Sequence, residues 1–243
     1  IALQVGVNYA NDYSDGIRGT DQNRIGPRRL VGSGLINANQ VKLAAGISFL
    51  IAAIAGLVLA IMTSLWLILI GCIAILAAWF YTGGSRPYGY SGYGEVSVFI
   101  FFGLVATVGS SYVQSQTIET ISMLCSVPVG LLASALLVVN NFRDIETDSE
   151  TGKQTFAVRL GKAKTKMFFA LLLLASLGMY VLIAVLYTYL VLITLVVIPL
   201  IIKLIYDIFS KENAQDLINL LENTAKLHLL AGVLLSIGLA AGL

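Results

Sequence analysis

The chain has 243 residues, of which 58% are hydrophobic and 12% charged, and its formal net charge is +2. No Asp, Glu, Lys or Arg lies between Lys42 and Arg86, or within 96–118, 120–142 and 167–202. A soluble helical domain needs a polar face on every helix, whereas about 20 apolar residues suffice to cross the hydrocarbon core of a bilayer. The composition therefore excludes a soluble domain and predicts an all-α, polytopic transmembrane helical bundle. Its expected partner is the lipid bilayer, and no nucleic-acid partner is expected.

The apolar segments predict seven complete spans that follow a shorter first segment. Residues 1–15 are expected to be the end of one more span, which begins before Ile1. The complete spans are expected at 40–61, 65–82, 95–114, 118–142, 166–187, 189–206 and 224–243. With one earlier helix the full protein would have nine, and residues 1–243 would be a single transmembrane domain that is incomplete at its N-terminus.

All 15 Lys and Arg residues fall on one side of the membrane when these spans alternate. They lie in the segments 16–42, 83–94, 143–166 and 203–226. The short turns on the other side, near 62–64, 115–118 and 187–189, carry none. By the positive-inside rule the basic side is cytoplasmic, which places the chain in the cell membrane as a multi-pass protein.

The first polar motif, NYANDYSDGIRGTD at residues 8–21, ends the first apolar segment. Its oxygen-bearing side chains include Asn8, Asn11, Asp12 and Asp15. At about 100° per residue, these four positions share an arc of about 100° on one helix face. The motif therefore predicts a stripe of carboxylates and amides at a membrane boundary.

A second motif, NNFRDIETDSETGKQTFAVRLG at residues 140–161, repeats this arrangement. Treated as one helix, it places Asn141, Asp144 and Asp148 on a single stripe. Asp12 and Asp144 lie 132 residues apart, which is the length of four helices and predicts a four-helix internal repeat. Two such stripes facing each other would form a pocket of four carboxylates with no cation in it.

Four carboxylates repel one another strongly at a membrane boundary unless something neutralises them. Mg²⁺ prefers oxygen ligands and commonly combines carboxylates with substrate phosphates. Basic residues near the motifs could bind the outer phosphate oxygens. These are Arg28, Arg29, Arg86, Lys153 and Arg159. Two plainer interpretations stay open: the acids could cap helices, and the cations could follow the positive-inside rule alone. The glycine-rich loop 83–94 is long for a helical hairpin and is expected to cover a site.

At this point NDYSD and DIETD, each ending a span and separated by four helices, resemble the motifs of the UbiA-type intramembrane prenyltransferases. RLVGSG and YTGGSRPYGYSGYGEV are similar to the branch that prenylates 1,4-dihydroxy-2-naphthoate in menaquinone biosynthesis. The resemblance implies nine helices around a chamber that opens into lipid. It also implies an enzyme that transfers a polyprenyl group from polyprenyl diphosphate to the naphthoate, with loss of CO₂ and pyrophosphate, giving demethylmenaquinone.

Residue by residue, the resemblance implies Mg²⁺ ligands at Asn8, Asp12, Asp15, Asn141, Asp144 and Asp148, with the four Asp residues catalytic. It implies diphosphate contacts from Arg28, Arg29, Arg86, Lys153 and Arg159, and a role for Tyr88 and Asn11 in binding or covering the acceptor. The chain departs from the family pattern at one position, because Gly19 stands where many relatives have a third Asp and the acid here is Asp21. The resemblance therefore does not carry a ligand role over to Asp21.

Three other interpretations are compatible with parts of the sequence. Another enzyme of the same type could act on 4-hydroxybenzoate, homogentisate or a tetrapyrrole. A secondary transporter would also have internal repeats and intramembrane acids, although these acids lie at helix ends on one side. A structural scaffold would leave the paired acids unexplained.

Overall fold

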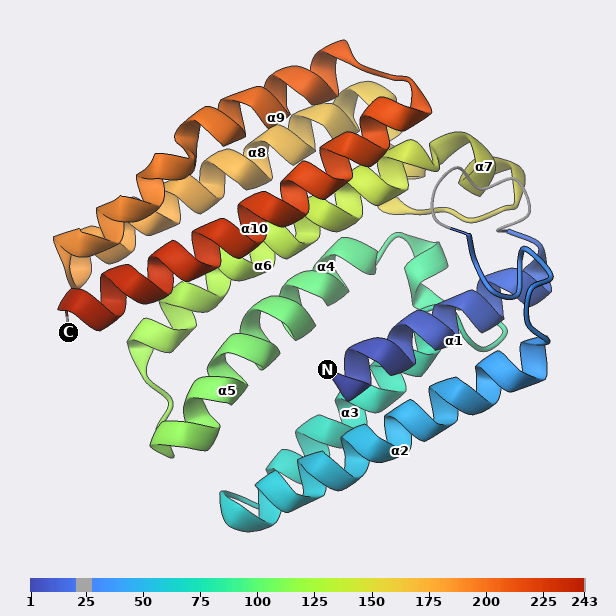
Figure 1. Ribbon diagram of the computed structural model, residues 1–243, viewed down its shortest axis with the longest axis horizontal. Helices are drawn as coiled ribbons and strands as arrows, with labels where there is room; N and C mark the ends of the chain where they lie inside the picture. The colour runs from blue at the N-terminus through green and yellow to red at the C-terminus, as the bar shows by residue number, and fades with distance from the viewer. Residues whose placement is uncertain (21–27, 243) are drawn as a thin grey trace. The chain divides into compact units, whose positions relative to one another are not determined.

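Every regular element that the computed structural model describes, over residues 1–20 and 28–242, is helical (Figure 1). This confirms the predicted all-α class. The elements are α1 (Ala2–Arg18), α2 (Ala38–Met62), α3 (Leu67–Phe80), η1 (Tyr88–Ser91), α4 (Gly94–Val98), the π-helix η2 (Phe99–Val105), α5 (Ala106–Ser115), α6 (Thr120–Arg143), α7 (Ile145–Glu150), α8 (Phe156–Leu186), η3 (Tyr189–Val197), α9 (Ile198–Ser210) and α10 (Ala214–Gly242).

Six helical segments in the described part of the chain are long and apolar enough to cross a membrane. They are Ala38–Met62, Gly94–Ser115, Thr120–Arg143, Phe156–Leu186, Tyr189–Ser210 and Ala214–Gly242. The one remaining expected span, 65–82, corresponds to α3, a shorter apolar helix of 14 residues. Two helices begin well before the predicted spans, α8 at Phe156 and α10 at Ala214, because hydropathy marks only the apolar part of a helix.

The contacts divide the chain into two compact units. The first unit comprises Ile1–Gly94 and Glu146–Phe156, and the second comprises Glu95–Ile145 and Ala157–Leu243. The units do not follow the predicted four-helix repeat, because η2 and α5, which the prediction assigns to the first repeat, pack on α6 in the second unit.

In the first unit, α1 packs against α2 and α3. The approach of α1 to α2 is close, because a Cβ atom on Gly6 would lie 2.6 Å from the ring of Phe49. Small side chains fill the rest of this interface, where Ala10, Ala45 and Ala78 are buried. Helix α1 ends at Gly19, whose φ of 75° is readily adopted only by glycine.

In the second unit, α10 packs on α6, η3 and α9 around a continuous apolar core. The π-helix η2 lies directly on α6. A Cβ atom on Gly103 would meet the Cα of Gly130 at 2.6 Å, and one on Gly130 would meet the ring of Phe99 at 2.7 Å. The backbones of η2 and α6 are therefore in contact at this crossing.

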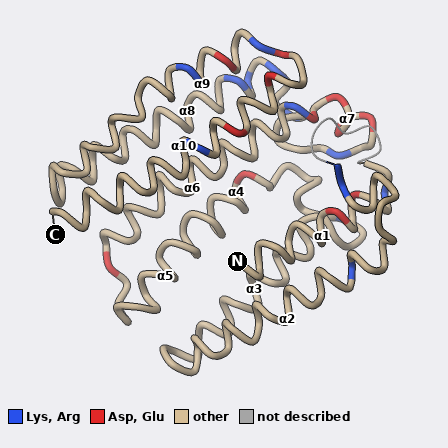
Figure 2. Tube along the Cα trace, viewed as in Figure 1, with Lys and Arg blue, Asp and Glu red and all other residues tan. Residues whose placement is uncertain are grey.

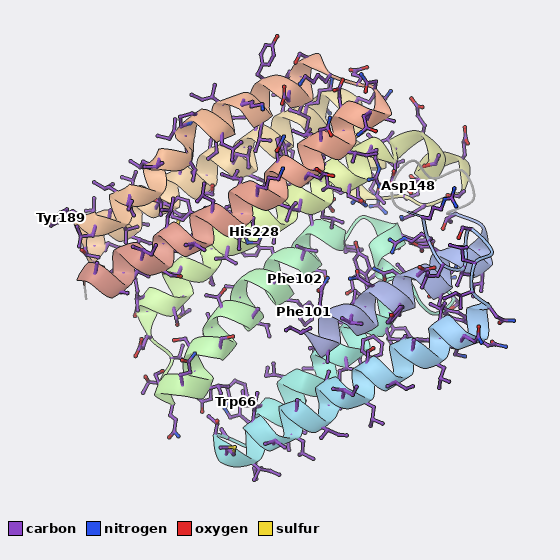
Figure 3. The ribbon with its side chains drawn as sticks, in the orientation of Figure 1. Trp66, Phe101, Phe102, Asp148, Tyr189 and His228 are labelled. Carbon is purple, nitrogen blue, oxygen red and sulfur yellow. The ribbon has the colours of Figure 1, made fainter. Side chains whose placement is uncertain are left out.

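Each unit, taken by itself, has apolar side chains exposed along its helices and a polar end. Large apolar side chains are exposed along the spans, including Leu50, Ile54 and Leu171, as expected for surfaces that face hydrocarbon. Most charged residues of each unit gather at one end of its helices (Figure 2). Exposed Trp66 and Tyr189 lie at the opposite helix ends (Figure 3), where membrane proteins concentrate interfacial aromatics.

Candidate functional site

Residues 8–18 of the first motif lie on α1, as predicted, and two of their carboxylates are buried. Asp12 is 5% exposed and Asp15 is 6% exposed. The two oxygens of Asp12 accept hydrogen bonds from the backbone N–H groups of Leu30 and Val31, both at 2.9 Å. Asp12 therefore anchors the segment that follows the motif as well as carrying negative charge. Asn8 is exposed on the same helix.

The loop after α3 covers the end of α1 through several side chains. Thr82 donates a hydrogen bond to Oδ1 of Asn11 at 2.9 Å. The Arg18 guanidinium donates to the carbonyl oxygens of Thr82 and Gly84, both at 2.5 Å. The hydroxyl of Tyr88 donates to the carbonyl oxygen of Ala77 at 2.9 Å. The loop therefore contacts the first motif at Asn11, whereas Tyr88 ties the loop to α3. A role for Tyr88 and Asn11 in binding or covering the acceptor stays a prediction.

Tyr90 of this loop contacts the second carboxylate of the motif. Its hydroxyl donates to Oδ1 of Asp15 at 2.5 Å. The Arg18 guanidinium and the Lys153 ammonium both lie over its ring, 5.3 Å and 5.2 Å from the centroid, which is cation–π geometry. Burial, and then the charge of Asp15, raise the pKa of Tyr90 well above its usual value. Tyr90 therefore stays a neutral donor to Asp15.

The second motif is not one helix, so its prediction as a single stripe is wrong. Helix α6 ends at Arg143, Asp144 follows with φ −97° and ψ 8°, and α7 begins at Ile145. Asp has a low preference for helix interiors because its side chain competes for nearby backbone groups. The break divides the motif between the units, with Asn141 and Asp144 in the second and Asp148 in the first.

Asp148 lies on α7 (Figure 3) and belongs to the same unit as Asp15. It is 5% exposed, and the Lys153 ammonium lies 3.3 Å from its Oδ1 atom. The next residue, Gln154, donates its backbone N–H to the carbonyl oxygen of Tyr90 at 2.9 Å. Lys153 thus lies near Asp148 and over the ring of Tyr90, which in turn binds Asp15, so one acid from each motif is joined in a single set of contacts.

The prediction that the pocket of acids contains no cation is also wrong. Besides Lys153 at Asp148, Arg143 forms a two-pronged pair with Asp144. Its Nε and Nη2 atoms lie 2.7 Å from Oδ1 and Oδ2. The same guanidinium donates to Oδ1 of Asn140 at 2.9 Å. The acids are therefore partly neutralised by the chain itself.

Several predicted phosphate-binding residues do not take part in the contacts described above for the motif acids. Arg28, Arg86 and Arg159 are exposed and form no ion pair within the described residues. Arg29 is half-buried. Asp21 lies outside the described residues. Lys153 is thus a predicted cation that the structure places against a motif acid, Asp148.

One buried acid at the second motif was missed from the sequence. Glu95 is 5% exposed, and its Oε1 atom accepts a hydrogen bond from Nδ2 of Asn141 at 2.9 Å. Glu95 directly precedes the charge-free segment 96–118. An ionisable residue at the start of an apolar span is a signal of function by default, and this signal was available.

The family model described as "UbiA prenyltransferase family" matches residues 1–237. The chain belongs to this family. Named relatives of the UbiA family align along its whole length. The 1,4-dihydroxy-2-naphthoate octaprenyltransferase of Mycobacterium tuberculosis is 45% identical over 242 residues, covering 100% of this chain and 82% of the relative. Proteins with the same name from Mycobacterium leprae and Haemophilus influenzae are 44% and 38% identical, covering 100% of this chain and 81% and 82% of their own lengths.

The oxygen-rich motifs of this UbiA family member suit a hard divalent cation. Within residues 1–20 and 28–242, no three His, Cys, Asp or Glu side chains lie close enough together to hold a metal ion. Mg²⁺, however, is usually held by one or two carboxylates together with substrate phosphates. Asp15 and Asp148, and separately Asn141 and Asp144, offer only oxygen donors of this kind. The donor set therefore fits Mg²⁺ that is bound jointly with a diphosphate.

Proposed function

We propose that the protein transfers a polyprenyl group from a polyprenyl diphosphate to 1,4-dihydroxy-2-naphthoate in a Mg²⁺-dependent reaction of menaquinone biosynthesis. The observation that carries this proposal is that relatives named 1,4-dihydroxy-2-naphthoate octaprenyltransferase align over the whole of this chain at 38–45% identity. The geometry of the motif residues supports it, because buried carboxylates stand beside cations, as a metal–diphosphate site requires.

The chain's own residues would hold the diphosphate in distinct ways. Asp15 and Asp148 of the first unit would supply oxygen ligands, as would Asn141 and Asp144 of the second. Asp12 holds the segment beginning near Leu30 in place. The bound metal would withdraw charge from the diphosphate oxygens, which makes pyrophosphate a better leaving group. Lys153 can turn from Asp148 toward a phosphate oxygen, because the 3.3 Å pair is loose and the side chain is 18% exposed. Arg28, Arg29, Arg86 and Arg159 are further cations that could bind the outer oxygens.

The carbon–carbon step balances without an oxidant. The allylic C–O bond breaks and its electron pair leaves with pyrophosphate. The ring carbon that bears the carboxylate forms the new bond to the prenyl carbon, and the bond to the carboxylate then returns its electron pair to the ring as CO₂ leaves. The product is therefore the quinol, and demethylmenaquinone forms from it by a separate oxidation. An apolar surrounding would protect the electron-poor prenyl carbon from water.

The location of the protein is part of the same proposal. Six membrane-length helices and membership of the UbiA family identify a multi-pass membrane protein. We place it in the cell membrane with both motifs on the cytoplasmic side. The support is the distribution of the 15 Lys and Arg residues, all on one side of the alternating spans.

The decisive experiment incubates the purified full-length protein with octaprenyl diphosphate and naphthoate that carries a label in its carboxyl group. The expected result is one labelled CO₂ and one pyrophosphate for each prenylated ring. Label that stays on the prenylated ring would contradict the decarboxylating step. Reaction with 4-hydroxybenzoate or homogentisate alone would contradict the acceptor, and substrate transport without pyrophosphate release would contradict the enzyme.

A further inference from the structure

A buried acid at the start of a membrane span has no cation beside it among the residues that the structure describes. Glu95 is the second residue of α4 and is 5% exposed. Within the described part of the chain no ion pair involves Glu95, and its Oε2 atom is buried without a hydrogen-bond partner. Burying a carboxyl group in this way is unfavourable, so packing alone does not account for an acid here.

Close packing of two helices holds Glu95 in this position. The hydroxyl of Ser134 on α6 donates to the backbone carbonyl oxygen of Glu95 at 3.1 Å. A few residues further along, η2 lies directly on α6 at Gly103 and Gly130. The start of α4 is thus fixed against α6 at two points, so the carboxyl group of Glu95 can adjust little.

The side chain that Glu95 contacts is Asn141 of the second motif. Nδ2 of Asn141 donates to Oε1 of Glu95 at 2.9 Å, and Asn141 is itself 5% exposed. The amide oxygen Oδ1 of Asn141 accepts no hydrogen bond from the residues that the structure describes. One end of the amide is therefore held, and the other is left available.

We infer that Glu95 is a positioning residue that sets the orientation of the Asn141 amide, so that Oδ1 is presented as a metal ligand. Oε1 of Glu95 accepts the hydrogen bond from Nδ2 of Asn141, and an oxygen that carries no proton cannot donate to an amide oxygen. This contact therefore holds the amide nitrogen and turns Oδ1 away. Without Glu95 the amide could rotate by half a turn and present an NH₂ group, which repels a cation. This inference rests on the proposed Mg²⁺-dependent function.

Removal of the acceptor tests the role of Glu95 through metal affinity. The probe is Mn²⁺ in the presence of inorganic pyrophosphate, with free Mn²⁺ measured by electron paramagnetic resonance on the full-length protein. Glu95→Met removes the acceptor at similar length and should raise the Kd for Mn²⁺ about tenfold, as loss of groups that orient ligands typically does. Glu95→Gln can still accept from Nδ2 but no longer selects it, so its Kd should rise less.

A double-mutant cycle separates positioning from a general structural role. In an Asn141→Ala background, Glu95→Met should cause no further rise in Kd, because Glu95 acts through Asn141. The control Glu119→Gln changes an exposed acid at the start of α6 and should leave the Kd unchanged.

Each failure has its own signature. An unchanged Kd in both Glu95 variants, or a rise that simply adds to that of Asn141→Ala, would overturn the inference while the wild type still binds Mn²⁺. If Glu95→Met does not fold, the isosteric Glu95→Gln variant alone decides, and an unchanged Kd for it overturns the inference. A wild type that neither binds Mn²⁺ with pyrophosphate nor transfers a prenyl group would overturn the proposed function itself.

Discussion

The hydroxyl of Tyr90 donates a hydrogen bond to Oδ1 of Asp15 at 2.5 Å, across 75 positions of sequence. The pair joins the loop after α3 to the first motif, and Lys153 over the Tyr90 ring extends the contact to Asp148. Since Tyr90 binds one motif acid and supports the cation at another, small changes to it should affect activity more than fold.

Tyr90→Phe should lower turnover about tenfold, because Asp15 loses the donor that orients it while the ring beneath Lys153 is kept. Tyr93→Phe, in the same loop but exposed, is the matched control and should have little effect. The measurement is initial rate at saturating substrates. Equal rates for the two variants would show that the Tyr90 hydroxyl is dispensable.

The pH dependence of stability should also report this hydrogen bond. The pKa of Tyr90 is raised in the folded protein, by burial first and by Asp15 second, so the neutral phenol is favoured in the folded state. The stabilisation is fully present below the unfolded pKa of about 10 and decreases as pH rises above it. The difference in Tm between wild type and Tyr90→Phe should therefore be constant from about pH 6 to 9 and shrink beyond pH 10. A difference that already shrinks below pH 8 would contradict the raised pKa.

Metal dependence should follow the motif acids. EDTA should abolish activity and Mg²⁺ should restore it. Asp148→Asn and Asp144→Asn should each lower kcat roughly 100-fold or more, since they remove charge stabilisation at the leaving group. Asp12→Ala should also lower the Tm, because the N–H groups of Leu30 and Val31 lose their acceptor. Near-normal turnover in the Asp148 or Asp144 variant would exclude that residue from the site.

Arg143 should matter for stability when no metal is present. Its side chain is 2% exposed and pairs with Asp144 at 2.7 Å, and removing one partner of a buried pair destabilises by about 3 kcal/mol or more. Arg143→Gln should therefore lower the Tm, and Mg²⁺ with pyrophosphate should raise that Tm more than it raises the wild-type Tm. Thermal unfolding with and without Mg²⁺ measures both effects. Equal shifts in the two proteins would show that the metal does not act on Asp144.

Lys153 and Arg86 should differ in their effect on the diphosphate substrate. Lys153 stands against Asp148, whereas Arg86 is exposed and pairs with none of the described acids. Lys153→Met should raise the KM for polyprenyl diphosphate and lower kcat, because it removes a cation at the leaving group. Arg86→Ala should raise the KM alone. An unchanged KM for Arg86→Ala would show that Arg86 does not bind the diphosphate and contributes only to the orientation of the chain in the membrane.

Much of this protein is encoded locally in its sequence. Charge-free segments alone predict the spans and the all-α class, because a helix in lipid must satisfy its own backbone hydrogen bonds and expose apolar side chains. The two motifs are also visible locally, as Asn and Asp side chains at the ends of apolar runs. Neither conclusion depends on where distant segments lie, so each could be drawn before any contact was known.

The partners of the motif residues depended on tertiary structure. Local periodicity could not show that the second motif breaks at Asp144. The spacing of its polar residues fits a continuous helix, although the helix in fact ends at Arg143 and a new one begins at Ile145. It also could not pair Tyr90 with Asp15, or Glu95 with Asn141, since these residues are 75 and 46 positions apart. Such contacts form only when α1 meets the loop after α3 and when η2 packs on α6 through glycine. The chemistry of each acid is set by the groups that folding brings against it.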